Sequence, residues 1–253
     1  MKLYKKIIAW AILSIILQIG GLFVLDNFVF KHSSKFKSNK IDIEKQNTKD
    51  INVIIPNGAE NVNISYNGKY LTYYENDTLY IEESKTGTKT EVKTEDNGEI
   101  LYYKWLSDRD RLIIAEKVVK DGETVIQLIT YSPKDSSVSY VTSICDYEDD
   151  MKVMKITEST FTSVYYVDIY RGGLKSMVYR IDINNDKSKV SLQASVLGNM
   201  QVIPHVDRLV YEDEINNKFY VTSPNKQLTF NSNKNLTLLG IDRNDVIYIG
   251  ELN

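Results

Sequence analysis

The chain has 253 residues, a net charge of −3, one cysteine and two histidines. A charge this close to neutral provides no strong positive field for binding nucleic acid, and one thiol cannot form an intramolecular disulfide. The composition therefore argues against a nucleic-acid-binding protein, a disulfide-rich secreted domain and a histidine-rich zinc site.

An apolar run without a charged residue occupies residues 7–25 and predicts a transmembrane helix. As an α-helix it would be about 28 Å long, close to the roughly 30 Å thickness of the hydrocarbon core of a bilayer. A signal peptide would be followed by a small-x-small cleavage site, which residues 26–30 lack. We therefore expect an uncleaved anchor that holds residues 7–25 in the lipid bilayer.

Lysines on the two sides of this anchor favour opposite orientations. Three lysines in residues 1–6 favour a cytoplasmic tail under the positive-inside rule, whereas four lysines in residues 31–40 oppose it. Long domains cross the membrane largely regardless of such charge. We expect a single-pass protein of the cell membrane, with its C-terminal domain extracytoplasmic. The abundance of Lys, Asn and Ile is typical of AT-rich bacterial genes.

Residues 26–50 are polar and rich in Lys, Ser and Asn. Such a segment buries too little apolar surface to offset the entropy lost on ordering, so we expect a stalk between anchor and domain. Its basic cluster, residues 31–40, fits contact with anionic headgroups and fits a solvated linker equally well.

From residue 51 onward, short apolar strands alternate with polar turns. The β-branched run 51–55 predicts a first strand, and Asn67-Gly68 is a hairpin signal. Strands joined by turns of a few residues are antiparallel neighbours in one sheet. The following strands are predicted at residues 69–74, 78–83, 89–92, 111–115, 125–131, 137–142, 162–169, 177–183, 189–195, 208–212, 218–222, 227–230 and 236–249, the last range containing a turn.

The strand pattern repeats along the domain. The equivalent second strands start at Tyr70, Leu112, Val164, Leu209 and Val246, spaced by 42, 52, 45 and 37 residues. Periods of roughly 40–45 residues with four strands each are typical of β-propeller blades, although a β-sandwich also has short, evenly spaced strands.

We predict an all-β, β-propeller-like domain over residues 51–253, with about five blades, preceded by one transmembrane helix. The fifth blade ends after two strands. The run 51–55 could supply a missing strand to it; otherwise the sheet stays open or the natural chain continues.

Three copies of the repeat carry a further pattern, in which a polar turn opens the unit and an apolar strand follows. The matching stretches are Ser65–Leu71, Leu79–Ile81, Lys85–Gly87, Trp105–Ile113 and Gly240–Tyr248. They resemble TolB-type propeller repeats, also found in the N-terminal domains of prolyl-oligopeptidase-type enzymes. The resemblance implies a propeller with a binding role. It carries over no catalytic residues, because in those peptidases they lie in a hydrolase domain for which this chain is too short.

Few residues offer catalytic chemistry. His32 falls in the stalk, where we expect it to be solvated, and His205 falls in a loop, where a packing role is expected. No G-x-S-x-G nucleophile motif is present. Cys145 would need a histidine base to act as a nucleophile, so we expect a buried structural thiol. We predict no catalytic, cofactor-binding or metal-binding residues and no cofactor.

Two acidic segments are candidate calcium sites. Residues 146–150 contain four carboxylates, the ligand type that Ca²⁺ prefers, but a solvated connection between blades explains them as well. Residues 182–186 resemble the start of a calcium loop, yet Lys187 occupies the glycine position. We expect a hairpin turn there. Arg171-Gly172-Gly173 lacks the Lys and Ser/Thr of a phosphate-binding loop.

These patterns favour a non-catalytic, membrane-anchored domain that binds another envelope component, in protein interaction or sensing. The 18 tyrosines suit strands, and exposed ones suit protein or glycan partners. The alternative is a carbohydrate-active or glycan-binding propeller at the cell surface. Its catalytic form would use Asp146, Glu148 and Asp149, since a glycosidase needs two carboxylates about 5–10 Å apart.

Overall fold

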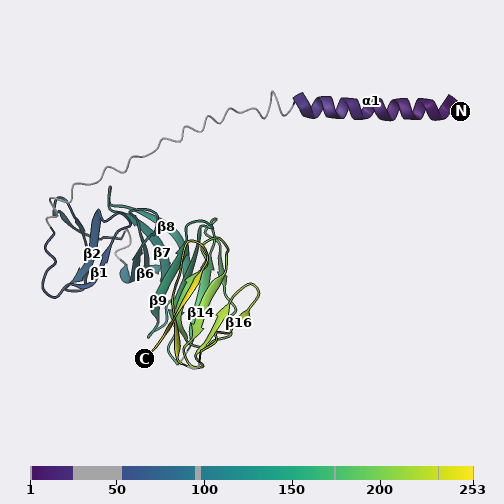
Figure 1. Cartoon of the computed structure of the whole chain (residues 1–253). Coiled ribbons are helices and arrows are strands. Elements are labelled where there is room, and N and C mark those ends of the chain that lie inside the picture. The colour runs from purple at the N-terminus through teal and green to yellow at the C-terminus, as the bar shows by residue number, and fades with distance from the viewer. Residues whose placement is uncertain (1, 25–52, 95–97, 174, 233, 253) are drawn as a thin grey trace. The chain divides into compact units, whose positions relative to one another are not determined.

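The computed structural model describes residues 2–24, 53–94, 98–173, 175–232 and 234–252. The helix α1 (Lys2–Val24) belongs to one unit of the chain, Met1–Asn47, and every strand belongs to the second, Thr48–Asn253 (Figure 1). The predicted stalk, with His32, lies outside the described residues.

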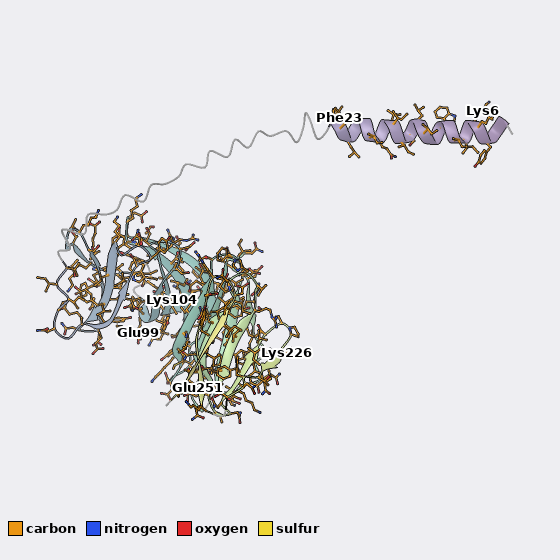
Figure 2. The ribbon with its side chains drawn as sticks, viewed as in Figure 1. Lys6, Phe23, Glu99, Lys104, Lys226 and Glu251 are labelled. Atoms are coloured by element: carbon orange, nitrogen blue, oxygen red, sulfur yellow. The ribbon has the colours of Figure 1, made fainter. Side chains whose placement is uncertain are left out.

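The helix α1 has no polar face. Its segment Tyr4–Val24 has a mean hydropathy of 2.4 and is long enough to cross a membrane. Side chains such as Lys6 and Phe23 project around it, and the described apolar ones are exposed (Figure 2). A helix that is apolar all round suits a lipid environment. Its length and composition fit a signal anchor and a signal peptide equally well.

The second unit contains four four-stranded antiparallel sheets and a fifth sheet of two strands, each strand pairing with its sequence neighbours. The first strands are β1 (Glu60–Ile64), β5 (Glu99–Trp105), β9 (Lys152–Ser159), β13 (Leu197–Val202) and β17 (Leu236–Ile241). The second strands are β2 (Tyr70–Glu75), β6 (Leu112–Lys120), β10 (Val164–Tyr170), β14 (Leu209–Asp213) and β18 (Ile247–Glu251). The third strands are β3 (Thr78–Glu83), β7 (Glu123–Ser132), β11 (Ser176–Ile181) and β15 (Lys218–Val221). The fourth strands are β4 (Lys89–Glu91), β8 (Ser137–Asp146), β12 (Lys187–Lys189) and β16 (Lys226–Leu228).

The predicted fold class is confirmed, because four-stranded sheets of this kind resemble propeller blades. Four of the five second strands begin at the predicted residue, and β18 begins at Ile247, one residue after the predicted Val246. Tight turns fix this spacing. Asn76 and Asp77 between β2 and β3, and Asp121 and Gly122 between β6 and β7, all have positive φ. This backbone is the one that two-residue hairpins require.

Two strand predictions are wrong. Val53–Ile55 form no strand, so the described part of the run 51–55 does not complete the fifth sheet; Ile51 and Asn52 lie outside the described residues. The first sheet instead begins with β1, whose residues are exposed and include two asparagines, a residue disfavoured in strands. The strand predicted at 189–195 is only β12, which ends at Lys189.

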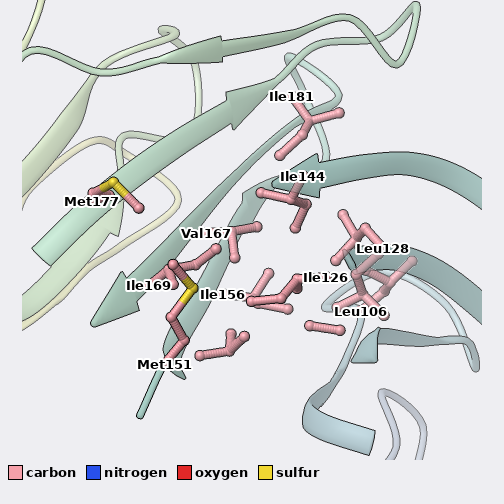
Figure 3. Close-up of a cluster of buried hydrophobic side chains, with 13 residues drawn as sticks. Leu106, Ile126, Leu128, Ile144, Met151, Ile156, Val167, Ile169, Met177 and Ile181 are labelled. Carbon is pink, nitrogen blue, oxygen red and sulfur yellow. The ribbon is translucent and has the colours of Figure 1, made fainter. Parts of the chain in front are cut away.

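Apolar side chains pack between each pair of consecutive sheets. On β6, Leu112 and Ile114 pack toward the first sheet, while Ile113 and Ala115 pack toward the third, and all four are 0% exposed. Figure 3 shows the cluster between the second and third sheets. Similar clusters join the third sheet to the fourth and the fourth to the fifth. Each large buried side chain contributes about 1.5–3 kcal/mol.

This packing brings the first strands of successive sheets together. β1 lies beside β5, β5 beside β9, β9 beside β13, and β13 beside β17. Among the described strands, β17 makes no comparable contact with β1. The first strands therefore form the inner edge of a propeller-like arrangement, running in sequence order from β1 to β17.

A partly buried hydrogen-bond network on the inner edge depends on Gly198. The pairing of β13 with β14 shifts register between Leu197 and Met200. There Glu212 accepts hydrogen bonds from the backbone N–H of Asn199, at 2.8 Å, and from that of Leu238 on β17. A Cβ on Gly198 would overlap the Glu212 carboxylate. Glycine thus permits the carboxylate to join the fourth and fifth sheets.

We predict that Gly198→Ala lowers the free energy of unfolding of the full-length protein in detergent by about 1–3 kcal/mol. The methyl group displaces the Glu212 carboxylate and leaves backbone N–H groups unsatisfied. Urea unfolding followed by circular dichroism measures the effect. Gly240→Ala is the control, because the nearest atom to its Cβ, Gln201 Oε1, is 3.4 Å away. Equal losses in the two variants would contradict the role of Gly198.

Candidate functional site

A cavity of about 380 Å³ opens where the first strands of three sheets meet. We call it the inner-strand cavity. Concave sites with a few convergent polar groups are the default candidates for ligand binding. Its lining comes from β1, β2, β5 and β9 and consists of Asn61, Asn63, Tyr74, Leu101, Tyr102, Tyr103, Lys104, Lys155 and Ile156.

One wall of the cavity is aromatic. The Tyr74 ring packs edge-on against Tyr103, with ring centroids 5.6 Å apart. The Tyr103 hydroxyl donates to the backbone carbonyl of Asn61 and accepts a 3.3 Å hydrogen bond from Asn63 Nδ2. Burial, assisted by Tyr103, raises the pKa of Tyr74 to about 12. These phenols therefore stay neutral near pH 7 and act as hydrogen-bonding groups.

The first-strand backbone positions these groups. The pairing of β1 with β2 shifts register between Glu60 and Asn63, and Asn61 has a positive φ of 52°. Asparagine tolerates this left-handed conformation better than most residues. The bulge directs the Asn61 carbonyl to Tyr103 and so joins the first sheet to the second.

Two lysines also line the cavity. Lys104 on β5 (Figure 2) forms a 2.6 Å ion pair with Glu158 on β9, whose side chain is only 3% exposed. Lys155 on β9 donates a 3.3 Å hydrogen bond to Asn199 Oδ1. Burial, followed by the nearby Lys104 ammonium, lowers the pKa of Lys155, and the Glu212 carboxylate opposes this shift. The cavity therefore has a positive side.

The predicted candidate residues lie elsewhere in the domain. His205 stacks on Phe161, with ring centroids 4.4 Å apart, and its Nδ1 lies 3.0 Å from Asp245 Oδ1. It packs loops of three sheets together. Cys145 is half-buried on β8, and burial raises the pKa of its thiol, which disfavours the reactive thiolate.

The acidic segments have structural partners. Glu148 forms an ion pair with Arg171, and Asp149 lines a separate cavity of about 580 Å³ together with Glu99. In that cavity Lys117 pairs with Glu99. In the described parts of the chain, no three His, Cys, Asp or Glu side chains gather to hold a metal ion.

Residues 182–186 form the hairpin turn that the sequence predicted. Asp182 Oδ1 accepts hydrogen bonds from the backbone N–H groups of Asn184, at 2.9 Å, and Asp186, at 3.0 Å. This side-chain cap on the turn is a common role for aspartate.

Sequence reasoning missed Lys104 and Lys155, because the strands β5 and β9 that carry them were not predicted. A signal was present: each lysine interrupts a short apolar run, in Tyr102–Trp105 and Val153–Ile156. A charged residue within such a run indicates a strand position that reaches solvent at an edge or a cavity.

Comparison with known proteins shows the fold. No protein-family model matches this sequence, and no curated protein matches it. A chain of a mitotic checkpoint complex is similar in structure, with a TM-score of 0.51 and 12% identity over 80% of this chain and 62% of that one. Dipeptidyl peptidase 4 from Porphyromonas gingivalis has a TM-score of 0.50 and 12% sequence identity, over 74% of this chain and 34% of that one. TolB from Acinetobacter baumannii has a TM-score of 0.44 and 13% sequence identity, over 66% of this chain and 42% of that one.

This chain thus spans less than two thirds of the length of each of these three proteins. The similarity is to β-propeller proteins of diverse function, and it is distant. The comparisons therefore support the propeller-like fold and no sequence family.

A buried acid lies near the inner edge. Asp168 on β10 is 2% exposed, and one of its carboxylate oxygens has no hydrogen-bond partner. Burial raises its pKa to about 7, against the effect of a hydrogen bond from Ser176. The native state therefore binds a proton more tightly than the unfolded chain. Stability falls as pH rises between the unfolded pKa and the raised native one.

We predict that Asp168→Asn removes the loss of stability that ionisation of this buried carboxyl group causes as pH rises. The free energy of unfolding of the variant, relative to the parent protein, should rise by about 2–3 kcal/mol from pH 5 to pH 8. Urea unfolding at a series of pH values measures it. Asp121→Asn, in an exposed turn, makes the same change of charge and serves as the control. A difference that stays constant with pH for Asp168→Asn would refute the argument.

Proposed function

We propose that this protein is a membrane-anchored binding protein, whose propeller-like domain lies outside the cytoplasm and binds another envelope component without catalysis. The observation that carries the proposal is the inner-strand cavity. Three sheets contribute hydrogen-bonding and cationic groups to it, and its described lining contains no nucleophile paired with a base, the arrangement that covalent catalysis requires.

The helix α1 supports the membrane part of the proposal. Residues 7–25 would act as the anchor, residues 1–6 as a cytoplasmic tail and residues 26–50 as a stalk for the domain of residues 51–253. The lysines of the tail favour this orientation.

The alternative is a glycan partner at the cell surface. It is favoured by Tyr74, Tyr102 and the two asparagines of β1, because their neutral polar groups suit hydroxyl-rich ligands. The carbohydrate-active form of this alternative requires Asp146, Glu148 and Asp149. The ion pair of Glu148 with Arg171 weighs against that form. Loss of a glycan-directed activity on alanine substitution of these acids would support it.

We predict that the purified full-length protein retains its N-terminal residues 1–25. Intact-mass measurement of a C-terminally tagged protein from membranes decides this. A mature N-terminus beyond residue 25 would show a cleaved signal peptide and remove the anchor from the proposal.

Site-specific crosslinking in cells tests the binding function. A photo-crosslinking residue at Asn63, which lines the inner-strand cavity, should capture a defined envelope component. The same residue at exposed Lys226 on β16, far along the fourth sheet from its first strand, is the matched control (Figure 2). Identical captured products at both positions would argue against the cavity. A catalytic turnover that persists through purification would refute the non-catalytic function.

A further inference from the structure

The Lys155 ammonium group has N–H donors that its described contacts do not use. Its ammonium group donates one hydrogen bond, to Asn199 Oδ1. Within the described parts of the chain, no carboxylate oxygen lies within 4.0 Å of it, whereas Lys104 beside it is paired with Glu158. An ammonium has three N–H donors. The described contacts therefore leave two donors of Lys155 available at the wall of the inner-strand cavity.

Nearby acids do not form an ion pair with this ammonium. Asp168 faces Lys155 across the β9–β10 pairing, but neither oxygen of its carboxylate lies within 4.0 Å of the Lys155 nitrogen. Glu212 attracts Lys155, yet its carboxylate already accepts hydrogen bonds from Asn199 and from β17. A half-buried cation beside a second cation is unfavourable unless an anion pairs with it. Burial and the neighbouring Lys104 ammonium disfavour the charged form of Lys155 and so lower its pKa.

The rest of the cavity offers neutral hydrogen-bonding groups. Tyr74, Tyr102 and the Asn63 side chain, whose Nδ2 already donates to Asn61 and Tyr103 but whose Oδ1 can accept, suit a ligand that bears hydroxyl groups. The cavity volume of about 380 Å³ falls in the range of roughly 300–1,000 Å³ typical of small-ligand sites.

We infer that the inner-strand cavity binds a sugar acid or sugar phosphate, whose carboxylate or phosphate pairs with Lys155. Tyr74, Tyr102 and the asparagines of β1 contact the hydroxyl groups of the sugar. This inference rests on the glycan-binding form of the proposed function and names the chemical class of its ligand. Such a group can belong to a free metabolite or to the end of an acidic envelope glycan.

The test uses the full-length protein in detergent and three related sugars. Glucuronate and glucose 6-phosphate carry an anionic group, and glucose has the same ring without it. Ligand-observed saturation-transfer NMR titrations measure binding. We expect saturable binding of the two acids and none of glucose at the same concentrations. An acidic glycan fragment that binds more tightly than either monosaccharide identifies the glycan as the source.

Lys155→Met should weaken binding of both acids by roughly tenfold or more, the loss expected for a charge-assisted hydrogen bond. Lys152→Met is the matched control, since it removes an exposed lysine from the same strand. Lys155→Arg keeps the charge and should retain binding, which separates loss of charge from misfolding.

Three outcomes would overturn the inference: unchanged binding by Lys155→Met, binding of glucose as strong as that of the acids, or no binding of either acid. The proposed function fails separately, through the crosslinking at Asn63. A partner captured there, together with no binding of either acid, would refute the inference and leave the proposed function standing.

Discussion

Apolar packing between the faces of consecutive sheets is the constraint from which the rest of this domain follows. Alternate residues on β6 pack toward different neighbours, so one strand serves two clusters. A sheet that buries both faces must have a neighbour on each side, which stacks the sheets in sequence order and aligns their first strands. The inner edge, and the cavity in it, are consequences of this packing.

Polar side chains then join the sheets along the inner edge. Links run from Asn63 to Tyr103, from Lys104 to Glu158, and from Lys155 through Asn199 to β17. Each joins one sheet to the next. Apolar packing sets the stacking of the sheets, while these hydrogen bonds and ion pairs fix how the first strands meet, because they demand specific distances and angles.

Three of the five second strands, β6, β10 and β14, carry a buried acid as their fifth residue, and the partners of that acid differ. Asp213 accepts hydrogen bonds from the turn at Ile215 and Asn216, and Glu116 accepts one from Gln127. Asp168 and Glu116 each keep one oxygen without a partner. Asp168 differs in its neighbour on the first strand. It faces Lys155, which lines the cavity, whereas Glu116 faces Ile100 and Asp213 faces Leu197.

The sequence by itself determined the apolar helix, the second and third strands and the repeat, because alternating apolar residues and tight turns are local signals. It did not reveal β1, β5, β9 and β13, since bulges and polar residues such as Asn61 obscure their alternation. The cavity was decided by tertiary structure alone. Lys104 and Lys155 are far apart in the sequence, and only the packing of the second sheet on the third brings them to one wall.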